Sequence, residues 1–536
     1  MTEVPAARPR KVRLALFAAM LVTLAVLHLR VRPGEGPYGV DGGNYYQTAR
    51  HVEAGHGLLT SISLYHLGLR KLPSPYSVNY PTWPWILGMT GRAIGLQNAA
   101  NVLPQILYVL DLILQYFLAN AVARRMLGED GLLSARSIVD YGHLFVLLLG
   151  VNALFFQATA YPYTEAIAFA FGFAALLCVD RMPGAGETSA PLLRRALPWA
   201  LLASVLVCLG FTSRSQMVVV AAGIGAALVW TALGDRRYAV AALAYGGLSA
   251  AICSVWYVRS ISIPPGAQAD IGGYPVWITS PTIGHFVSER LEGLRVSLTP
   301  FHPLSYFALF GASVLLVVVA ALLGARALLR RETWRAALHP PAEALLVRAV
   351  ALSGVAAFVS LTLYHANFWL PWLFGYRHGF PFIFLLLVAV PYLMRLAGTS
   401  TPARAAILAL LLLTIGWSVQ KTIALLRTPP RGYARSVKQL FGWLDAHPGT
   451  PTVLTSEPAL VASYSKAVAH WTLCSEPPEQ TRRMLAALPI DYVIVFSDQT
   501  RCPFVRGMAP VLEPRVQFGS GPQAIYVLAP KRPSRR

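Results

Sequence analysis

The sequence contains few charged residues for its length. Of its 536 residues, 13% are charged and 55% are hydrophobic, whereas soluble domains carry about 25% charged residues. At about 150 residues per soluble domain, a chain of this length would form several globular units. Too few polar side chains are present to cover the surfaces of several such units. The composition therefore excludes a wholly soluble protein and predicts that most of the chain faces lipid.

Acidic residues are the scarcer of the two charged classes. The chain has 24 Asp and Glu residues against 45 Lys and Arg residues, a formal net charge of +21. An excess of this kind can indicate nucleic-acid binding. Here 19 of the 45 basic residues lie in the N-terminal tail and in the loops on the predicted inner side, as in the cytoplasmic loops of membrane proteins. We therefore expect no nucleic-acid partner.

Sequence motifs for nucleotides and zinc are also missing. The chain has no P-loop and no zinc-type spacing of Cys and His residues, so nothing supports ATP-driven chemistry. Three of the five cysteines lie in apolar runs and are most simply small core residues. The other two, Cys474 and Cys502, lie near the C-terminus. They could form a disulfide in an oxidising compartment, or remain two thiols.

Long apolar runs dominate the first four fifths of the chain. A helix needs about 20 apolar residues to cross a bilayer, and the pattern predicts about eleven spans. The runs cover approximately 13–30, 101–123, 138–157, 164–179, 197–212, 217–234, 238–258, 304–325, 347–365, 378–394 and 404–426. Residues 83–96 mix apolar and polar side chains and are more typical of an interfacial helix.

The basic residues predict the orientation of the spans. Arg8, Arg10, Lys11 and Arg13 precede the first run and place the N-terminus in the cytoplasm. An odd number of spans then places the C-terminus on the other side. We expect a multi-pass cell-membrane protein whose segments 31–100, 259–303 and 427–536 are extracytoplasmic.

The C-terminal segment has a different pattern. Within 427–536, β-type runs at 452–456, 492–497 and 524–528 alternate with helical stretches at 434–446 and 478–488. Strands separated by helices are typical of an α/β domain. The predicted fold is an all-α polytopic membrane domain over 1–426, followed by a small extracytoplasmic α/β domain over 427–536.

Carboxylates at the predicted outer surface are candidates for catalysis. Asp41 is followed by Gly42 and Gly43, which would let a ligand approach the backbone closely; Asp41 could equally cap the helix that follows. Glu165 lies between two apolar runs, where a carboxylate is costly and often functional, or it complements a helix dipole. Asp111 lies inside a span and could pair with a neighbouring helix or line a polar cavity.

Three arginines depart from the orientation pattern. Arg214, Arg377 and Arg259 lie at the predicted outer ends of spans. Each alone could extend toward lipid headgroups. Together with the outer carboxylates they indicate a site that holds an anion, such as a phosphate, beside a base.

The order of these short motifs resembles a known superfamily. The chain is similar to the polytopic glycosyltransferases of the GT-C fold, which include the lipid A aminoarabinose transferases and the protein O-mannosyltransferases. The similarity extends in order over residues 10–395. The motifs are Asp41-(x)3-Tyr45-(x)3-Ala49, the segment Tyr80-Pro81-Thr82-Trp83-Pro84-Trp85, the turn that ends at Glu165, the Ser213-Arg214 turn, the segment that ends at Arg259, and Tyr376-Arg377-(x)3-Pro381.

The resemblance implies a reaction and a set of site residues. The donor would be a polyprenyl-phosphate sugar, and the acceptor a glycan, lipid or protein. Asp41 and Glu165 would be catalytic. The donor phosphate would be bound by Arg214, Arg377, Arg259 and His378, and the substrates would be contacted by Tyr45, Tyr80 and Tyr376.

The resemblance implies no nucleotide cofactor. A divalent cation, Mg or Mn, could bind to Asp41 and Glu165, but many relatives have a second acidic residue where this chain has Gly42.

Two other classes of protein fit the same spans. One is a transporter or flippase of lipid-linked glycans, which would have polar residues throughout its spans, whereas the candidates here cluster on the outer side. The other is a non-catalytic scaffold whose C-terminal segment recruits envelope partners.

Overall fold

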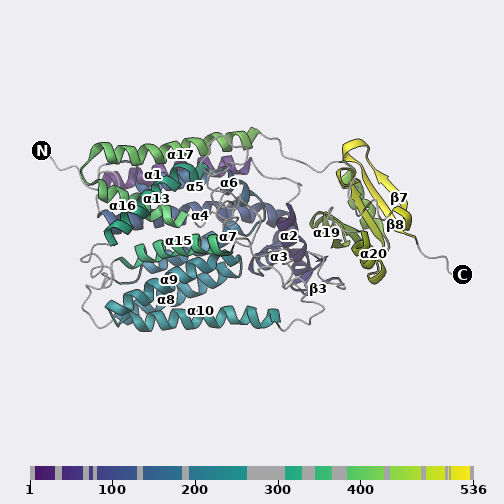
Figure 1. Cartoon of the computed structure of the whole chain (residues 1–536), viewed down its shortest axis with the longest axis horizontal. Helices are drawn as coiled ribbons and strands as arrows, with labels where there is room; N and C mark the ends of the chain where they lie inside the picture. Colours follow the sequence, from purple (N-terminus) through teal and green to yellow (C-terminus); the bar gives the residue numbers. More distant parts are fainter. Residues whose placement is uncertain are drawn as a thin grey trace.

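The computed structural model divides into a helical bundle and a β-sheet at one end of it (Figure 1). It describes residues 7–30, 39–63, 72–75, 81–128, 137–183, 192–261, 308–328, 344–364, 383–427, 435–472, 478–500, 505 and 509–531. Several predicted site residues lie outside these ranges: Tyr80, Tyr376, Arg377, His378, Cys474 and Cys502. The side chain of Arg259 is also outside the described part.

The bundle contains a helix in every predicted apolar run. Its helices are α1 (Ala7–Leu29), α4 (Leu96–Leu127), α5 (Tyr141–Gly150), α6 (Ala153–Ala160), α7 (Glu165–Asp180), α8 (Leu192–Phe211), α9 (Val218–Gly234), α10 (Tyr238–Ile261), α13 (Ala308–Leu328), α15 (Leu345–Tyr364), α16 (Ile383–Ala397) and α17 (Thr401–Arg427). The run at 138–157 forms two helices because Asn152 caps α6, its side-chain oxygen accepting from the Phe155 N–H at 2.9 Å.

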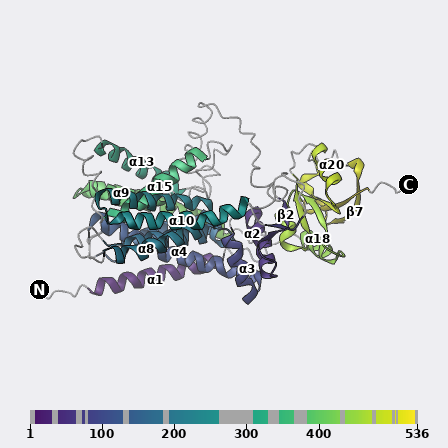
Figure 2. The same cartoon turned by 90° about the horizontal axis from the view of Figure 1, so that it is seen from below.

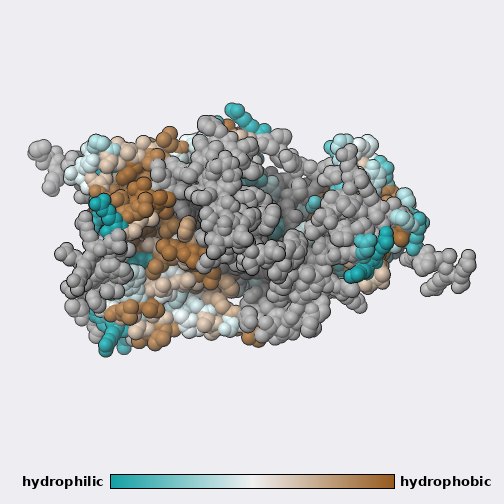
Figure 3. All heavy atoms as spheres, in the orientation of Figure 1, coloured by the Kyte–Doolittle hydropathy of each residue, from teal (hydrophilic) through white to brown (hydrophobic). Residues whose placement is uncertain are grey.

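Some of these helices are long and apolar enough to cross a membrane. Within the described residues there are five, at Lys11–Leu29, Leu96–Leu127, Arg194–Phe211, Tyr238–Val255 and Thr401–Arg427. Large apolar side chains on the bundle surface are exposed to an extent unusual for a soluble protein, among them Leu243 at 76% and Leu233 at 73%. Figure 3 shows apolar atoms over the side of the bundle and hydrophilic atoms on its end and on the sheet-bearing part. This surface fits a membrane protein.

Two helices close the end of the bundle opposite the start of α1 (Figures 1 and 2). They are α2 (Gly39–Glu53) and α3 (Thr82–Ile94). The chain turns from α3 into α4 at Gly95, whose φ of 81° favours glycine. The helix expected at 83–96 is thus present as α3.

Six strands form a mixed sheet next to α2 and α3. Its order is β2-β5-β4-β6-β8-β7, parallel from β2 to β6 and antiparallel for β8 and β7. The strands are β2 (Ile62–Ser63), β4 (Thr452–Thr455), β5 (Val468–Trp471), β6 (Tyr492–Phe496), β7 (Leu512–Phe518) and β8 (Ile525–Pro530). A separate two-stranded sheet pairs β1 (Leu59–Thr60) with β3 (Ser74–Pro75).

Helices cover both faces of the larger sheet. The side chains of α18 (Arg435–Ala446) and α19 (Pro458–Tyr464) share one apolar core with β4 and β5, whereas α20 (Pro478–Ala487) belongs to a second core. The edge strand β2 comes from the first loop, which the sequence analysis had assigned to the membrane domain. The sheet is therefore built from two segments about 400 residues apart in sequence.

Candidate functional site

Asp41 lies in the first turn of α2 and is half-buried. The first turn carries the positive end of the helix dipole, which favours a carboxylate there. Residues 42–49 of α2 are buried, and Tyr45 and Ala49 form an apolar cluster with Trp83 of α3 and Ile167 of α7. The cluster joins the helix that carries Asp41 to the helix that begins at Glu165.

Glu165 and Arg214 form a buried ion pair. Arg214 lies in the turn between α8 and the 3-10 helix at Ser215–Met217, and its Nη1 is 3.0 Å from Oε1 of Glu165. Nη1 also donates to Oγ1 of Thr164 at 3.2 Å, and Nε donates to Oε1 of Gln216 at 2.8 Å. Both residues of the pair are over 90% buried. Glu165 holds the guanidinium of Arg214 in one orientation and neutralises its charge. Neither effect could be predicted from the two motifs taken separately.

The aromatic motif of α3 contacts the same two turns. Nε1 of Trp83 donates to the carbonyl of Pro162 at 2.7 Å. The N–H of Thr82 donates to the carbonyl of Thr212 at 3.2 Å, and the two threonine hydroxyls are 2.7 Å apart. The described parts of three sequence motifs, at 81–85, 161–165 and 213–214, thus meet at this end of the bundle.

A polar network, which sequence analysis missed, fixes α2 against residues 59–63. Nε2 of Gln47 donates to Oγ1 of Thr60 at 3.0 Å, and its Oε1 accepts from the N–H of Ser61 at 2.8 Å. Nε2 of His51 lies 2.7 Å from Oγ of Ser61. Burial, with the charges of Arg50 and His56, lowers the pKa of His51 to about 4. The sequence feature that could have indicated this network is the high number of polar side chains in 39–53.

The residues of this region do not fit a divalent cation. Magnesium and manganese prefer several oxygen ligands. Within the described part of the chain, no group of three His, Cys, Asp or Glu side chains is placed to hold a metal. Glu165 already faces the cation of Arg214.

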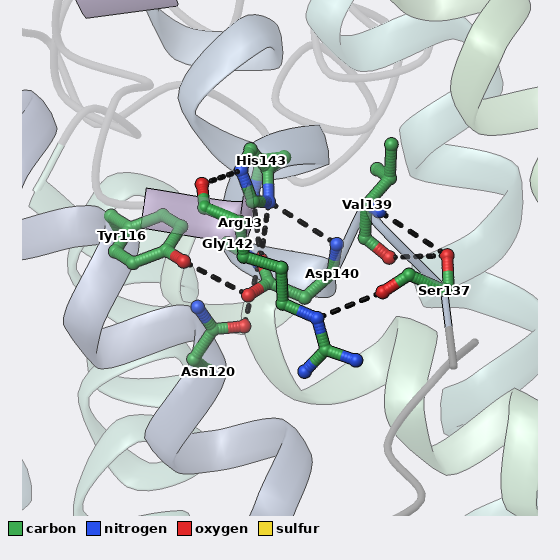
Figure 4. A network of polar contacts seen from close by, with 8 residues as sticks. All are labelled: Arg13, Tyr116, Asn120, Ser137, Val139, Asp140, Gly142 and His143. Carbon is green, nitrogen blue, oxygen red and sulfur yellow. Dashed lines mark hydrogen bonds and ion pairs between the residues drawn. The ribbon is translucent and has the colours of Figure 1, made fainter. Parts of the chain in front are cut away.

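A second polar network lies at the other end of the bundle, next to the start of α1 (Figure 4). Asp140 caps α5, accepting from the His143 N–H at 3.1 Å, and the Tyr116 hydroxyl donates to its other oxygen at 2.9 Å. Nε2 of His143 lies 3.0 Å from the carbonyl of Arg13. These contacts join three helices, which is a structural role.

Solved membrane transferases share this fold. ArnT from Cupriavidus metallidurans is 14% identical, and the match covers 96% of this chain and 97% of ArnT with a TM-score of 0.56. The Archaeoglobus fulgidus oligosaccharyltransferase is 13% identical, with 89% and 69% of the two chains covered and a TM-score of 0.56. The arabinofuranosyltransferase AftD from Mycobacteria is 15% identical, with 95% and 41% covered and a TM-score of 0.50.

These similarities define the fold class. No protein-family model matches the chain, and no curated protein sequence matches it. The three structures are GT-C fold glycosyltransferases. This chain therefore has the GT-C fold, which confirms the resemblance drawn from its motifs.

Proposed function

We propose that the chain is an integral membrane glycosyltransferase that moves a sugar from a polyprenyl-phosphate donor to an acceptor on the extracytoplasmic side. The observation that carries the proposal is the GT-C fold, matched over 96% of this chain and 97% of ArnT. The Archaeoglobus fulgidus oligosaccharyltransferase AglB, 12% identical with a TM-score of 0.53, has a structure in complex with an inhibitory peptide and a dolichol-phosphate. That complex supports the donor class. The fold favours a transferase over a transporter or a scaffold.

Asp41 is the proposed general base. Its half-buried place in the first turn of α2 leaves the carboxylate access to a substrate, while the rest of the helix is held by buried contacts. The carboxylate accepts a proton from the acceptor hydroxyl or amine. The acceptor oxygen or nitrogen then bonds to the anomeric carbon, the bond from that carbon to the phosphate oxygen breaks, and the configuration inverts.

Arginines bind the leaving phosphate in this proposal. Arg214 is oriented by Glu165, and Arg377, Arg259 and His378 are further candidates from the sequence. Cations placed around a leaving phosphate stabilise the charge that grows on its oxygen. Glu165 then acts through Arg214 rather than directly on the acceptor. Tyr80 and Tyr376 remain candidates for substrate contact, whereas the burial of Tyr45 supports a packing role.

A metal is known in one related structure. The Archaeoglobus fulgidus oligosaccharyltransferase has a complex with Zn and sulfate, at 12% identity and a TM-score of 0.51. The described side chains around Glu165 do not offer the oxygen ligands that Mg or Mn requires. The proposed steps therefore use no metal ion.

The role of Asp41 is tested by transfer from a radiolabelled polyprenyl-phosphate sugar in membranes that contain the chain. We expect Asp41→Asn to lower the rate about 100-fold or more, because a general base contributes 10²–10⁴-fold. Glu513→Gln is the matched control, since Glu513 is an exposed carboxylate on β7. An Asp41→Asn rate equal to wild type at equal protein level would remove Asp41 from the mechanism.

The phosphate-binding role is tested at Arg377. Arg377→Ala should raise the donor concentration needed for half-maximal rate about tenfold while the protein level stays unchanged, because a charge-assisted bond to phosphate is lost. Arg515→Ala, at an exposed position on β7, is the control. Parallel losses of protein and activity would instead indicate a structural role for Arg377.

A further inference from the structure

The N-terminal half of α2 is in direct contact with α19, a helix that packs on the larger sheet. We propose that α19, which packs on the larger sheet, is a positioning element for Asp41. It would hold the carboxylate of the proposed base in place without touching the substrate. This inference rests on the proposed function. The strand β2, which follows α2, is joined to the sheet. The N–H of Ala469 in β5 donates to the carbonyl of Ser61 at 2.8 Å, and Ile62 is 1% exposed in the apolar core of the sheet. The loop that follows α2 is thus anchored inside the sheet.

The closest contact lies two residues from Asp41. Oγ of Ser463 donates to the carbonyl of Gly43 at 2.7 Å. A Cβ on Gly43 would lie 2.9 Å from the carbonyl oxygen of Ala459 and 3.0 Å from Oγ of Ser463. Cβ atoms essentially never lie closer than 3.0 Å to a neighbouring heavy atom, and the nearest obstacle here is backbone, so any larger residue at 43 would separate α2 from α19. Glycine is required here by the neighbouring helix, not by its own backbone angles.

Two more residues on the same face of α2 contact α19. The Tyr46 ring stacks on Tyr464 with a centroid distance of 5.6 Å. Nη1 of Arg50 donates to the carbonyls of Ala462, Ser463 and Ser465 at 3.1, 3.1 and 2.8 Å. These carbonyls end α19, where a cation satisfies unpaired acceptors and the negative end of the dipole. Positions 43, 46 and 50 are spaced as one helix face. The end of α19 therefore contacts α2 from residue 43 to residue 50.

A different face of α2 is fixed by α3. A Cβ on Gly88 would lie 2.6 Å from the carbonyl of Ala49, and Nε of Arg92 donates to the carbonyl of Val52 at 3.0 Å. These contacts lie in the second half of α2, whereas Gly43 is its fifth residue, two positions after Asp41. A change in α19 should therefore move Asp41 while the C-terminal end of α2 stays in place.

The experiment measures transfer kinetics and amide hydrogen exchange on the full chain in detergent. We expect Gly43→Ala to lower kcat at least tenfold and Ser463→Ala to lower it about three- to tenfold, with donor KM changed less than twofold, because neither residue is among the proposed ligands of the donor phosphate. Exchange of the 39–46 amides should rise in both variants. The double variant should be no slower than Gly43→Ala alone, because both changes act on one contact.

The matched control is Ser497→Ala, which removes an exposed hydroxyl from the same sheet part, where Oγ donates to the Pro522 carbonyl. It should leave kcat and exchange at wild-type values. Wild-type kcat in both Gly43→Ala and Ser463→Ala, with Asp41→Asn inactive, would overturn the positioning role alone. Wild-type kcat in Asp41→Asn would contradict the proposed function, and the positioning role with it.

Discussion

At the scale of single residues, the structure changes the meaning of two candidates. Glu165 and Arg214 were predicted from separate motifs as a catalytic carboxylate and a phosphate ligand. They form one buried pair at 3.0 Å, a relation between positions 49 residues apart that no local pattern reveals. Each motif was visible in the sequence because its residue type is unusual at the outer end of a span. The pairing of the two residues was not visible in the sequence, because it depends on how α7 and α8 pack against each other.

Breaking this pair should be costly. Glu165→Gln leaves the Arg214 guanidinium buried beside a neutral amide, which should lower the free energy of unfolding by about 3–5 kcal/mol. The measurement is thermal unfolding of the purified chain in detergent. Asp235→Asn is the control, because its partner Arg237 is exposed and such pairs contribute little. Equal melting temperatures for Glu165→Gln and wild type would show that the pair does not stabilise the fold.

Histidines at the joint between α2 and the sheet should make its stability depend on pH. Burial lowers the pKa of His470 in β5 to about 4, as it does for His51. The unfolded chain, with histidine pKa values near 6.5, binds more protons between pH 4 and 6.5. Stability should therefore be full above about pH 6.5 and fall as the pH drops toward 4.

His470→Gln tests this dependence. The variant should lose less melting temperature than wild type between pH 7.5 and pH 5, since one of the two titrating groups has gone. His447→Gln, at the end of α18, is the control histidine. A pH dependence identical to that of wild type would exclude His470 as its source.

At the scale of helices and strands, the long apolar runs predicted the helices well because length and hydropathy are local properties. The β-type runs at 452–456 and 492–497 coincide with β4 and β6 for the same reason. The strand β2 could not be predicted: it has two residues, too few for any alternation, and its partner is β5, about 400 residues away. Pairing at that separation is decided by packing rather than by local pattern.

The long helix α4 contains an unusual buried carboxyl. Within the described residues, neither oxygen of Asp111 nor either polar atom of Gln115, one turn further on, has a hydrogen-bond partner. The pairing with a neighbouring helix that the sequence left open is thus not seen there.

Replacing this carboxyl should stabilise the chain. Asp111→Leu removes an unpaired buried polar group that costs about 1–3 kcal/mol, so the melting temperature in detergent should rise. Thr23→Leu, on the exposed side of α1, is the control. A fall in melting temperature with Asp111→Leu would show that the carboxyl has a stabilising partner.

At the scale of the whole molecule, charge and hydropathy agree with a membrane protein, and two parts of the chain meet at the end of the bundle that holds the described candidate site residues. Arg8, Arg10, Lys11 and Arg13 lie in the first turns of α1, and the sheet, α2 and α3 lie at the opposite end of the bundle (Figure 2). The basic residues of the sequence predict that the first loop and the C-terminal segment lie on one side of the membrane. The joint between them through β2 and α19 shows how both contribute to one region.

The central claim is that this chain transfers sugar from a polyprenyl phosphate. The most direct measurement is release of free polyprenyl phosphate from a labelled polyprenyl-phosphate sugar by the purified chain in liposomes, with an envelope extract as acceptor. The account predicts release by wild type and a rate about 100-fold lower for Asp41→Asn. No release by wild type across the sugar donors offered, or equal release by Asp41→Asn, would contradict it.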